Sequence, residues 1–414
     1  MGHAAPFKKK LASNSAAQEN CEAVAVYWEV CVADRAGTPR LARKTCLYGA
    51  VAITLQVGFS SVPAHAETIG LVMTNFSLGG PWTTDGKKEC PEGFNTTNQA
   101  NFEAQYKTPE ERREVTKKYG SLQWHYRGPN GESDVYNPEA VPDPLPHFDG
   151  QGTVSDGMNL DGTQDGQATD KTCKHAKYTS PTGEQVDNQL YRALGCVKSV
   201  RPLGLLDAFT NMEIPQLSVN RWVLEITGVD SRVNDDHVEI TIAHGLDELV
   251  ADGNGGFVAG RTQRINEGAS SYVQRATGRI KDGVLYSDVM PMLRLTVSGI
   301  IEAGERRFSD ARFRLKLTET GATGMIAAYS DIARLYRYHA KTIGLHGVAG
   351  TTSMPSFYRA LWRHADGHKD PATGQCTSIS GHYAVNFVNA NIVRPSAVAE
   401  VAETIAKRAA DTRR

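Results

Sequence analysis

The sequence predicts a mainly β protein, an antiparallel β-sandwich with peripheral helices and an irregular N-terminal region rich in cysteine and aspartate. Three observations support this fold class. Apolar and polar residues alternate in short stretches between residues 222 and 317, turn-forming residues separate the stretches, and helical patterns are confined to the flanks. Alternation with a period of two indicates half-buried strands. Many short strands with regular turns favour an antiparallel sandwich over a parallel sheet.

Most of residues 67–200 is predicted to be irregular, with one clear helix. Thr108 supplies an N-cap, Pro109 stands at the first helical position, and Glu111 completes a capping box. This pattern starts a helix that should end near Gly120. Because most of its residues are charged, we expect the helix to lie on the surface.

Strands are expected across residues 201–396, together with inserted helices. The dipeptide Asp282-Gly283 predicts a two-residue hairpin turn, because both residues tolerate the positive φ angles that such turns require. Helical spacing returns around residues 332–339 and after Pro355, and residues 397–414 form a C-terminal tail that is helical at best. Five stretches carry the strand prediction: 222–226, 238–242, 293–297, 313–317 and 383–392.

Residues 1–66 are predicted to be an N-terminal extension followed by an export signal. A basic pair precedes an apolar run from Leu47 to Phe59, and residues 64–66 give a small-x-small cleavage pattern, so the mature chain should begin near Glu67. The alternative is a single membrane anchor. That run, however, falls short of the roughly 20 apolar residues that span a bilayer. We therefore expect a periplasmic or extracellular protein with no membrane span after signal removal.

The balance of charges argues against a nucleic-acid partner. The chain has 45 basic and 46 acidic residues and a formal net charge of −1. It becomes slightly more negative once residues 1–66 are removed. Nucleic-acid binding requires a concentrated basic face, and the sequence contains no such concentration.

Four cysteines follow the predicted cleavage site: Cys90, Cys173, Cys196 and Cys376. An even number in an exported chain predicts two disulfides, for which three pairings are possible. The short separation between Cys173 and Cys196 favours that pair, which leaves Cys90 with Cys376. A metal site is the alternative use of cysteine, but the sequence has no Cys-x-x-Cys pair.

The segment 149–170, called the Asp/Gly segment below, repeats aspartate or asparagine beside glycine. Ca²⁺ needs six to eight oxygen ligands on a tightly curled backbone, and this composition supplies both. The match to an EF-hand loop is partial, because position twelve is Thr172 rather than glutamate. The alternative is a solvent-exposed loop of turns. The predicted structural Ca²⁺ ligands are Asp161, Thr163, Asp165, Gln167 and Thr169, with Asp187 and Asn188 from outside the loop.

The stretch from Asn159 to Cys196 resembles a segment of uncharacterised exported bacterial proteins. The resemblance is carried by Asn159-Leu160-Asp161-Gly162, Cys173, Ser180-Pro181-Thr182-Gly183, residues 186–190 and Gly195-Cys196. In those proteins the second half also resembles a β-rich region, and with it the resemblance covers about half of the expected mature chain. It implies export and a shared β-rich scaffold, with Asp187 and Asn188 beside the Asp/Gly segment, and it implies no activity.

Candidate catalytic residues are limited to four histidines: His237, His244, His364 and His368. His364 and His368 flank Asp366, and with His382 they could also hold zinc or copper. Polar turns or the end of a helix are the favoured explanation for each of these positions. Searches for a nucleophile elbow, a phosphate loop and a zinc-protease helix find none of these motifs in the sequence.

Together these observations predict an exported, disulfide-bonded, calcium-stabilised β-rich protein that acts as a binding or structural envelope component. The partner would be an extracellular or periplasmic ligand, with carbohydrate as one candidate class. The alternative is a secreted hydrolase or lyase whose histidine and aspartate site lies between the sheet and the C-terminal helices. The sequence favours the non-enzymatic role.

Overall fold

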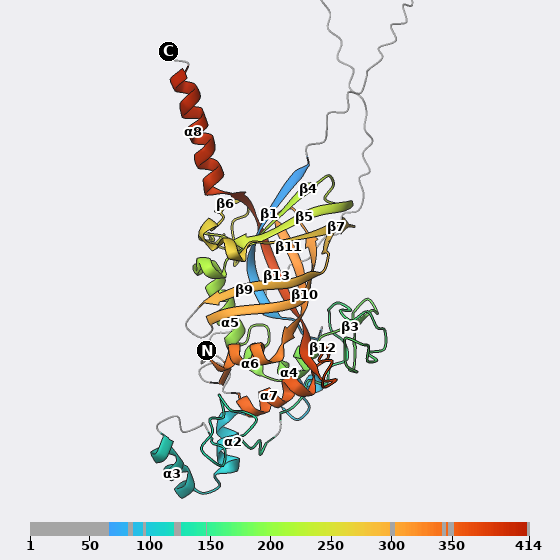
Figure 1. Ribbon diagram of the computed structural model, residues 1–414, viewed down its shortest axis with the longest axis vertical. Coiled ribbons are helices and arrows are strands. Elements are labelled where there is room, and N and C mark those ends of the chain that lie inside the picture. Colours follow the sequence, from blue (N-terminus) through green and yellow to red (C-terminus); the bar gives the residue numbers. More distant parts are fainter. Residues whose placement is uncertain are drawn as a thin grey trace, which may run out of the picture. The chain divides into compact units, whose positions relative to one another are not determined.

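The central feature of the computed structural model is a closed antiparallel β-barrel (Figure 1). Eight strands form it in the order β1, β4, β5, β7, β8, β10, β11 and β13, and β13 pairs with β1 to complete the ring. The structure describes residues 66–81, 86–93, 97–119, 126–145, 147–298, 303–341, 345–346 and 352–411. The predicted extension and export signal therefore lie outside the described residues, apart from Ala66.

The strands vary widely in length, and β13 is the longest. The barrel strands are β1 (Glu67–Leu78), β4 (Trp222–Val229), β5 (Asp235–His244), β7 (Gln274–Lys281), β8 (Val284–Ser287), β10 (Ala303–Leu317), β11 (Gly321–Asp331) and β13 (Cys376–Val393). Three further strands extend this sheet. Strand β9 (Met290–Ser298) pairs with β10, and both β6 (Arg261–Arg264) and β12 (Gly367–Lys369) pair with β13. Strands β2 (Tyr178–Thr179) and β3 (Gln185–Val186) form a separate two-stranded sheet.

The predicted β-sandwich is wrong, and β1 shows why. Sequence analysis assigned residues 67–78 to an irregular region, whereas the structure makes them the strand that pairs with β4 on one side and β13 on the other. Leu71 packs in the main apolar core and Val72 in a second cluster, so β1 is buried on both faces. A strand with two buried faces shows no alternation. Without β1 the sheet would have kept two open edges and could not close.

Local signals in the sequence were confirmed. Helix α3 (Pro109–Tyr119) begins with the predicted capping box, in which the backbone N–H of Glu111 donates to Thr108 Oγ1 and the backbone N–H of Thr108 donates to Glu111 Oε2. Asp282 and Gly283 have φ angles of 52° and 74° and connect β7 to β8 as the predicted two-residue hairpin. Both signals act within a few residues.

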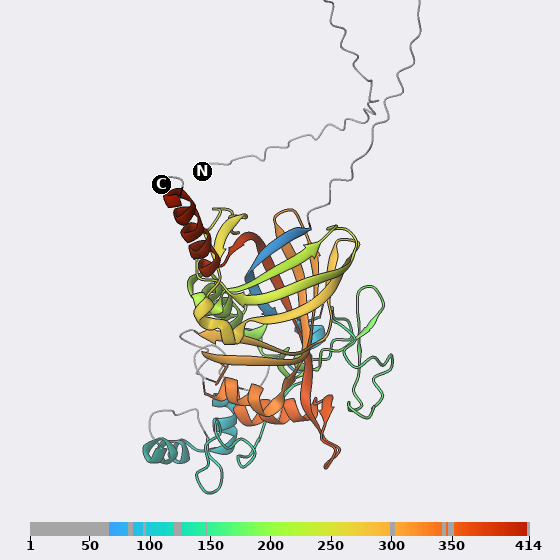
Figure 2. The same cartoon turned by 45° about the horizontal axis from the view of Figure 1, so that its top comes forward.

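Helix α7 contacts both α4 and α6 at one end of the barrel (Figures 1 and 2). Asp331 caps α6 and Ser353 caps α7 through side-chain oxygens, as their preceding sequence allows. None of the helices in the described part of the chain combines the length and apolar character that crossing a bilayer requires. The helices are α1 (Gly86–Glu89), α2 (Asn98–Gln105), α3, α4 (Gln189–Leu194), α5 (Leu205–Gln216), α6 (Ile332–Ala340), α7 (Met354–Arg363) and α8 (Pro395–Asp411).

The four cysteines that follow the predicted cleavage site form disulfides, as predicted, but the favoured pairing was wrong. Cys90 bonds to Cys196 and Cys173 bonds to Cys376, across sequence separations of 106 and 203 residues. Short separation favoured Cys173 with Cys196, yet the segment from Cys173 runs beside β12 and β13, where the backbone N–H of Cys173 donates to the carbonyl of Asp366. Tertiary contact, not sequence distance, decides which cysteines meet.

Candidate functional site

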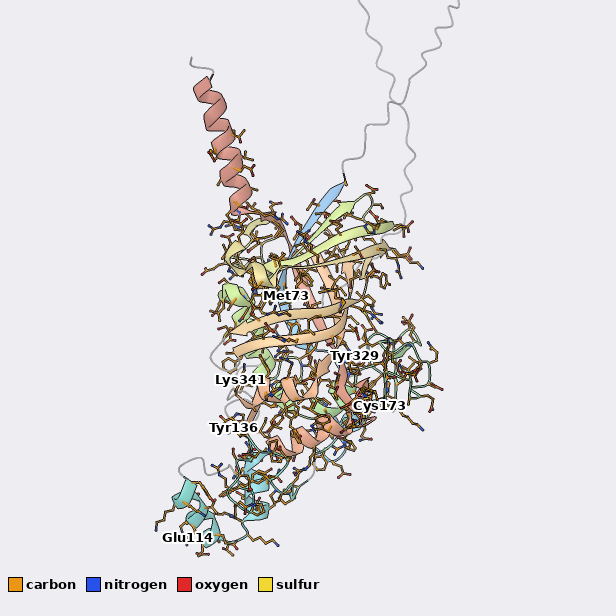
Figure 3. All side chains as sticks on the ribbon, in the orientation of Figure 1. Met73, Glu114, Tyr136, Cys173, Tyr329 and Lys341 are labelled. Carbon is orange, nitrogen blue, oxygen red and sulfur yellow. A yellow bond between two sulfur atoms is a disulfide. The ribbon has the colours of Figure 1, made fainter. Side chains whose placement is uncertain are left out.

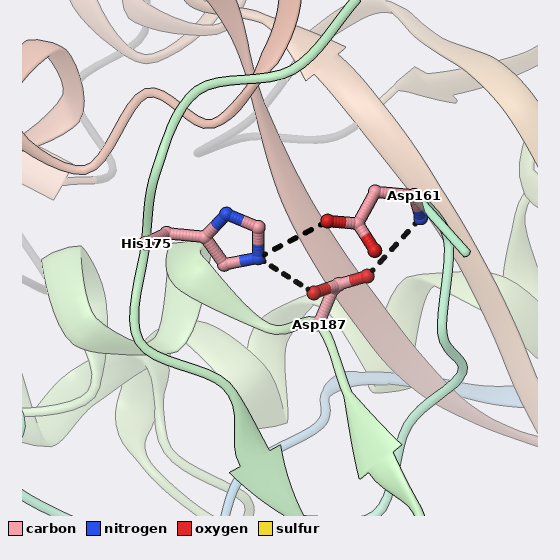
Figure 4. Close-up of side chains that lie close together, drawn as sticks. All are labelled: Asp161, His175 and Asp187. Carbon is pink, nitrogen blue, oxygen red and sulfur yellow. Dashed lines mark hydrogen bonds and ion pairs between the residues drawn. The ribbon is translucent and has the colours of Figure 1, made fainter. Parts of the chain in front are cut away.

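Three carboxylates and two basic side chains converge beside the barrel, at the end where the helices gather. Asp161 comes from the Asp/Gly segment, His175 and Lys177 from the stretch before β2, Asp187 from the residue after β3, and Asp366 from the link between α7 and β12. Their side chains are at most 4% exposed. Figure 4 shows His175 directed at Asp161 and Asp187. We call these five residues the polar cluster.

The β2–β3 hairpin explains why Lys177 and Asp187 meet. Tyr178 pairs with Val186 across the hairpin, so the residues just outside that pair, Lys177 and Asp187, lie opposite each other. The turn between the strands includes Gly183, whose φ of 91° is in the left-handed region that favours glycine. The Ser-Pro-Thr-Gly sequence at 180–183 therefore positions two members of the polar cluster.

His175 is the centre of the cluster. Its Nε2 lies 2.8 Å from Asp187 Oδ1, 3.8 Å from Asp161 Oδ2 and 3.9 Å from Asp366 Oδ2. Its Nδ1 lies 2.8 Å from the carbonyl oxygen of Cys173. Since a carbonyl only accepts hydrogen bonds, Nδ1 carries a proton, and Nε2 is the atom directed at the three carboxylates.

Lys177 supplies a second positive charge. Its Nζ lies 2.5 Å from Asp161 Oδ1 and 2.7 Å from Asp187 Oδ1. Asp187 uses its other oxygen to accept a hydrogen bond of 2.7 Å from the backbone N–H of Leu160, which ties the Asp/Gly segment to β3. A buried carboxylate with this many donors is strongly fixed in place.

Burial and charge act against each other on the pKa values of the cluster. Burial alone would raise the pKa of Asp187, but the hydrogen bonds from His175 and Lys177 lower it. Burial alone would lower the pKa of His175, and its hydrogen bond to Asp187 and the charge of Asp366 outweigh that effect and raise it. Burial raises the pKa of Asp366 to about 7. The same kind of side chain therefore has opposite shifts within one cluster.

Two polar atoms at this site make no hydrogen bond to any described residue. Asp366 is fully buried, and while its Oδ1 accepts from the backbone N–H of Ser380 at 2.7 Å, its Oδ2 has no hydrogen-bond partner there. The hydroxyl of Tyr329 is also buried and without a partner in the described chain. Burial, and then the carboxylates of Asp366 and its neighbours, raise the pKa of Tyr329. Figure 3 labels Tyr329 and Cys173 at this end of the barrel.

The residues predicted to bind Ca²⁺ divide into two groups. Asp161 and Asp187 come together in the polar cluster, and Thr163 supports them by donating from Oγ1 to Asp161 Oδ2 at 2.8 Å. The other four make separate contacts. Asp165 accepts from the backbone N–H of exposed Gln167, Thr169 bonds to Thr172 and its carbonyl accepts from Lys369, and Asn188 donates to the carbonyl of Gly79.

His175, Lys177 and Asp366 were not among the predicted ligands. His175 lies two residues from Cys173 with no recognisable spacing to any aspartate, so no local signal could have identified it. Asp366 lies in the His-Ala-Asp-Gly-His motif at 364–368, whose histidines, rather than its carboxylate, are the predicted functional residues. The cluster joins residues that are 205 positions apart in sequence, from 161 to 366.

His237 and His244 stand near the two ends of β5 and belong to no common site with the other candidates. His237 is exposed, and its backbone N–H donates to Asp235. The His244 ring lies 3.8 Å from that of Trp222, its Nε2 lies 3.1 Å from Thr296 Oγ1, and burial lowers its pKa to about 4. Such a histidine is a neutral core residue.

His368 forms a chain with a serine and an aspartate. Its Nδ1 lies 2.8 Å from Ser378 Oγ and its Nε2 lies 2.9 Å from Asp310 Oδ2. Acyl transfer needs an accessible serine, but here the serine is the least exposed of the three residues. Ser378 is only 2% exposed, whereas the side chains of His368 and Asp310 are 38% and 43% exposed. A nucleophile must reach its substrate, so this chain is better explained as a structural bond between β10, β12 and β13.

A cleft of about 340 Å³ lies next to the polar cluster. Its walls come from the Asp/Gly segment, the stretch at 174–176, α4 and the end of α7, and His175 forms part of the boundary between cleft and cluster. Within it, Asp149 Oδ1 lies 2.7 Å from Arg363 Nη2 and 3.1 Å from His364 Nε2. Burial by itself would raise the pKa of Asp149, but the nearby His364 and Arg363 outweigh burial and lower it.

The chain matches no family model, and neither the curated proteins nor the solved structures contain a match to it. The predicted resemblance to exported bacterial proteins therefore stays a prediction, and arguments about function start from the geometry above.

Proposed function

We propose that this chain is an exported protein that binds a small organic anion in the cleft between α4 and α7. The observation that carries the proposal is an excess of positive charge in a concave site. Lys174, Arg192 and Arg363 line the cleft, and among the described residues around it Asp149 alone is acidic. Concave sites with a few convergent polar groups are the usual places for small ligands. Two disulfides fit an exported location.

The three cations are held differently, and this suggests how a ligand would bind. Arg363 is paired with Asp149. The guanidinium carbon of Arg192 lies 4.2 Å from the ring centre of Tyr178, and its Nη1 reaches the carbonyls of Gly150 and Gly152 at 3.3 and 3.4 Å. Lys174 is exposed and makes no ion pair with any described residue. We therefore propose that Lys174 contacts the anionic group directly, and acidic sugars are the first class to test.

A structural cation is the second part of this proposal. The sequence predicted Ca²⁺ at the Asp/Gly segment, and the meeting of Asp161 with Asp187 supports a cation there. Its role would be to fix one wall of the cleft. Elemental analysis of the purified chain tests this part, and a protein without bound metal would contradict it.

Substitution of Lys174 tests the anion site. Binding of galacturonate, sulfate and a neutral sugar to the purified chain would be measured by titration calorimetry. We expect the acidic ligand to bind and Lys174→Glu to weaken it by about tenfold or more, since one charged contact contributes on the order of 1.5–3 kcal/mol. Lys316→Glu makes the same charge change on the exposed surface of β10 and serves as the control. Equal effects of the two variants, or no binding of any anion, would exclude the site.

A hydrolase or lyase is the second candidate, and one pair favours it. His364 lines the same cleft, and its Nε2 lies 3.1 Å from Asp149 Oδ1, a neighbour of the kind that often orients a histidine base. An enzyme of this kind would turn over an anionic substrate and lose turnover in His364→Ala while still binding it. A binding protein would show no turnover with any substrate that it binds.

A further inference from the structure

We propose that Asp161, His175, Asp187 and Asp366 bind one divalent transition-metal ion, and that Zn²⁺ fits this donor set best. This site shares only Asp161 and Asp187 with the predicted Ca²⁺ ligands. It adds the imidazole of His175 and the distant carboxylate of Asp366, and it leaves out the five other predicted ligands. It is independent of whether the cleft binds an anion.

The spacing of the donor atoms suits a small ion. His175 Nε2 lies between 2.8 and 3.9 Å from one oxygen of each of the three carboxylates. In a tetrahedral site with bonds of about 2.0–2.1 Å, neighbouring donor atoms are roughly 3.3 Å apart. The donor atoms of Asp161, His175 and Asp187 all lie within 4.8 Å of one another. Asp366 Oδ2 lies 3.9 Å from His175 Nε2 but outside this group of three, so Asp366 would have to turn inward to become the fourth ligand.

The tautomer of His175 directs a lone pair at the site. Because Nδ1–H donates to the carbonyl of Cys173, the neutral imidazole has its lone pair on Nε2. Without an ion, a proton on Nε2 bonds to Asp187 Oδ1 at 2.8 Å. A bound metal ion would replace that proton, and Nε2 would then present its lone pair to the metal. Histidines that bind metals commonly donate their other N–H to a carbonyl or carboxylate in this way.

The buried oxygen of Asp366 is an independent indication of a ligand. Asp366 has an accessibility of 0%, and its Oδ2 makes no hydrogen bond to the described chain although it lies 3.9 Å from His175 Nε2. Buried carboxylate oxygens are normally satisfied, because leaving one without a partner is costly. A metal ion at the centre of the cluster would satisfy it.

The charges of the cluster also balance with a divalent ion. Asp161, Asp187 and Asp366 contribute three negative charges and Lys177 one positive charge, in a place closed to water. One divalent cation and a neutral His175 make the total zero. Lys177 bonds to Asp161 Oδ1 and also to Asp187 Oδ1 at 2.7 Å, which leaves Asp161 Oδ2 directed towards His175. The lysine therefore neutralises charge beside the site, and Asp187 Oδ1 would be shared between the lysine and the ion.

The donor set selects the class of metal. Ca²⁺ takes six to eight oxygen ligands, whereas this site offers one imidazole and three carboxylates in a closed, buried position. An imidazole ligand favours zinc and other transition metals, while the three carboxylates also suit Mn²⁺, so the comparison of Zn²⁺ with Mn²⁺ decides between them. A site with four protein ligands and no open position would have a structural role. The ion would join the Asp/Gly segment, the β2–β3 hairpin and the α7–β12 link, next to the Cys173–Cys376 disulfide.

Metal content and thermal stability test the proposal on the purified full chain. The protein would be stripped with a chelator and equilibrated separately with Zn²⁺, Mn²⁺ and Ca²⁺. We expect one Zn²⁺ per chain by elemental analysis and a larger rise in Tm with Zn²⁺ than with Ca²⁺. Asp366→Asn should weaken Zn²⁺ binding by at least about 100-fold, beyond the roughly 10–100-fold typical of outer-sphere changes. Asp165→Asn, in the exposed loop, is the matched control and should leave Zn²⁺ binding unchanged.

Cobalt provides a second readout, which the unmodified chain gives without any substitution. Co²⁺ in the unmodified chain should give the strong visible absorption of a four-coordinate site, and His175→Gln should remove the nitrogen contribution. Three results would overturn the proposal: no retained metal and no Tm shift, Ca²⁺ binding that Asp165→Asn abolishes, or full Zn²⁺ affinity in a folded Asp366→Asn chain. The second result would restore the predicted Ca²⁺ loop.

Discussion

Two histidine–aspartate pairs in this protein have nearly the same geometry and very different surroundings. His175 and Asp187 lie 2.8 Å apart with side chains 4% and 0% exposed, and His368 and Asp310 lie 2.9 Å apart with side chains 38% and 43% exposed. The first pair is surrounded by further charges. The second also bonds to Ser378 but faces water.

The difference shows that distance alone does not indicate function. Water screens an exposed ion pair, so the pair contributes little to the stability of the fold. A buried pair has lost its water, so each charge depends on its neighbours, and removing one partner leaves the other uncompensated. The exposed pair resembles a catalytic arrangement more closely by residue type, but the buried pair has the surroundings that a ligand site requires.

The largest expected effect comes from removing the buried carboxylate. Asp187→Asn leaves His175 and Lys177 without their shared negative partner and should lower the free energy of unfolding by about 3–5 kcal/mol. The matched change Asp310→Asn should cost about 0–1 kcal/mol. Urea denaturation at pH 7 measures both. Similar losses in the two variants would mean that burial does not distinguish these pairs.

The disulfides offer a second comparison between the same regions. Replacing a native disulfide by two serines typically costs about 2–5 kcal/mol. The loop closed by Cys173 and Cys376 is about twice as long as that closed by Cys90 and Cys196, which adds only about 0.6 kcal/mol by chain entropy. The Cys173–Cys376 disulfide also holds the stretch before β2 beside Asp366. We therefore expect its double serine variant to lose more stability than the Cys90–Cys196 variant, by more than this difference in chain entropy. Thermal unfolding of the two variants checks it, and equal losses would show that the disulfide does not support the polar cluster.

A smaller effect is expected from the histidines buried among neutral groups. Burial lowers the pKa of His244 and His382 to about 4, while the unfolded value is near 6.5. The unfolded chain therefore binds these protons first, and stability is lost as the pH falls from about 6.5 to 4. Each histidine should contribute about 1–3 kcal/mol to this loss. His244→Gln should flatten the fall in stability measured by denaturation between pH 7 and 4, and an unchanged slope would contradict the assigned shift. His175, with a raised pKa, contributes with the opposite sign and loses its contribution as the pH rises.

Sequence-based prediction succeeded where the signal was local. The capping box at Thr108, the hairpin at Asp282-Gly283 and the alternating strands all depend on residues within a few positions of one another. It failed for β1, whose two buried faces remove the alternation, and for the disulfide pairing, which depends on the path of the chain. Of the polar cluster, it identified Asp161 and Asp187 and missed His175, Lys177 and Asp366.

The amino-acid sequence by itself determined that the chain is β-rich, that its four later cysteines would be paired, and that aspartates gather between residues 149 and 187. Each of these follows from composition or short-range pattern, which the unfolded chain already contains. Only the tertiary structure decided that the strands close into a barrel and that Asp366 meets His175. Both depend on contacts between residues far apart in the chain, and such contacts are selected by burying apolar surface and balancing charge in the folded state as a whole.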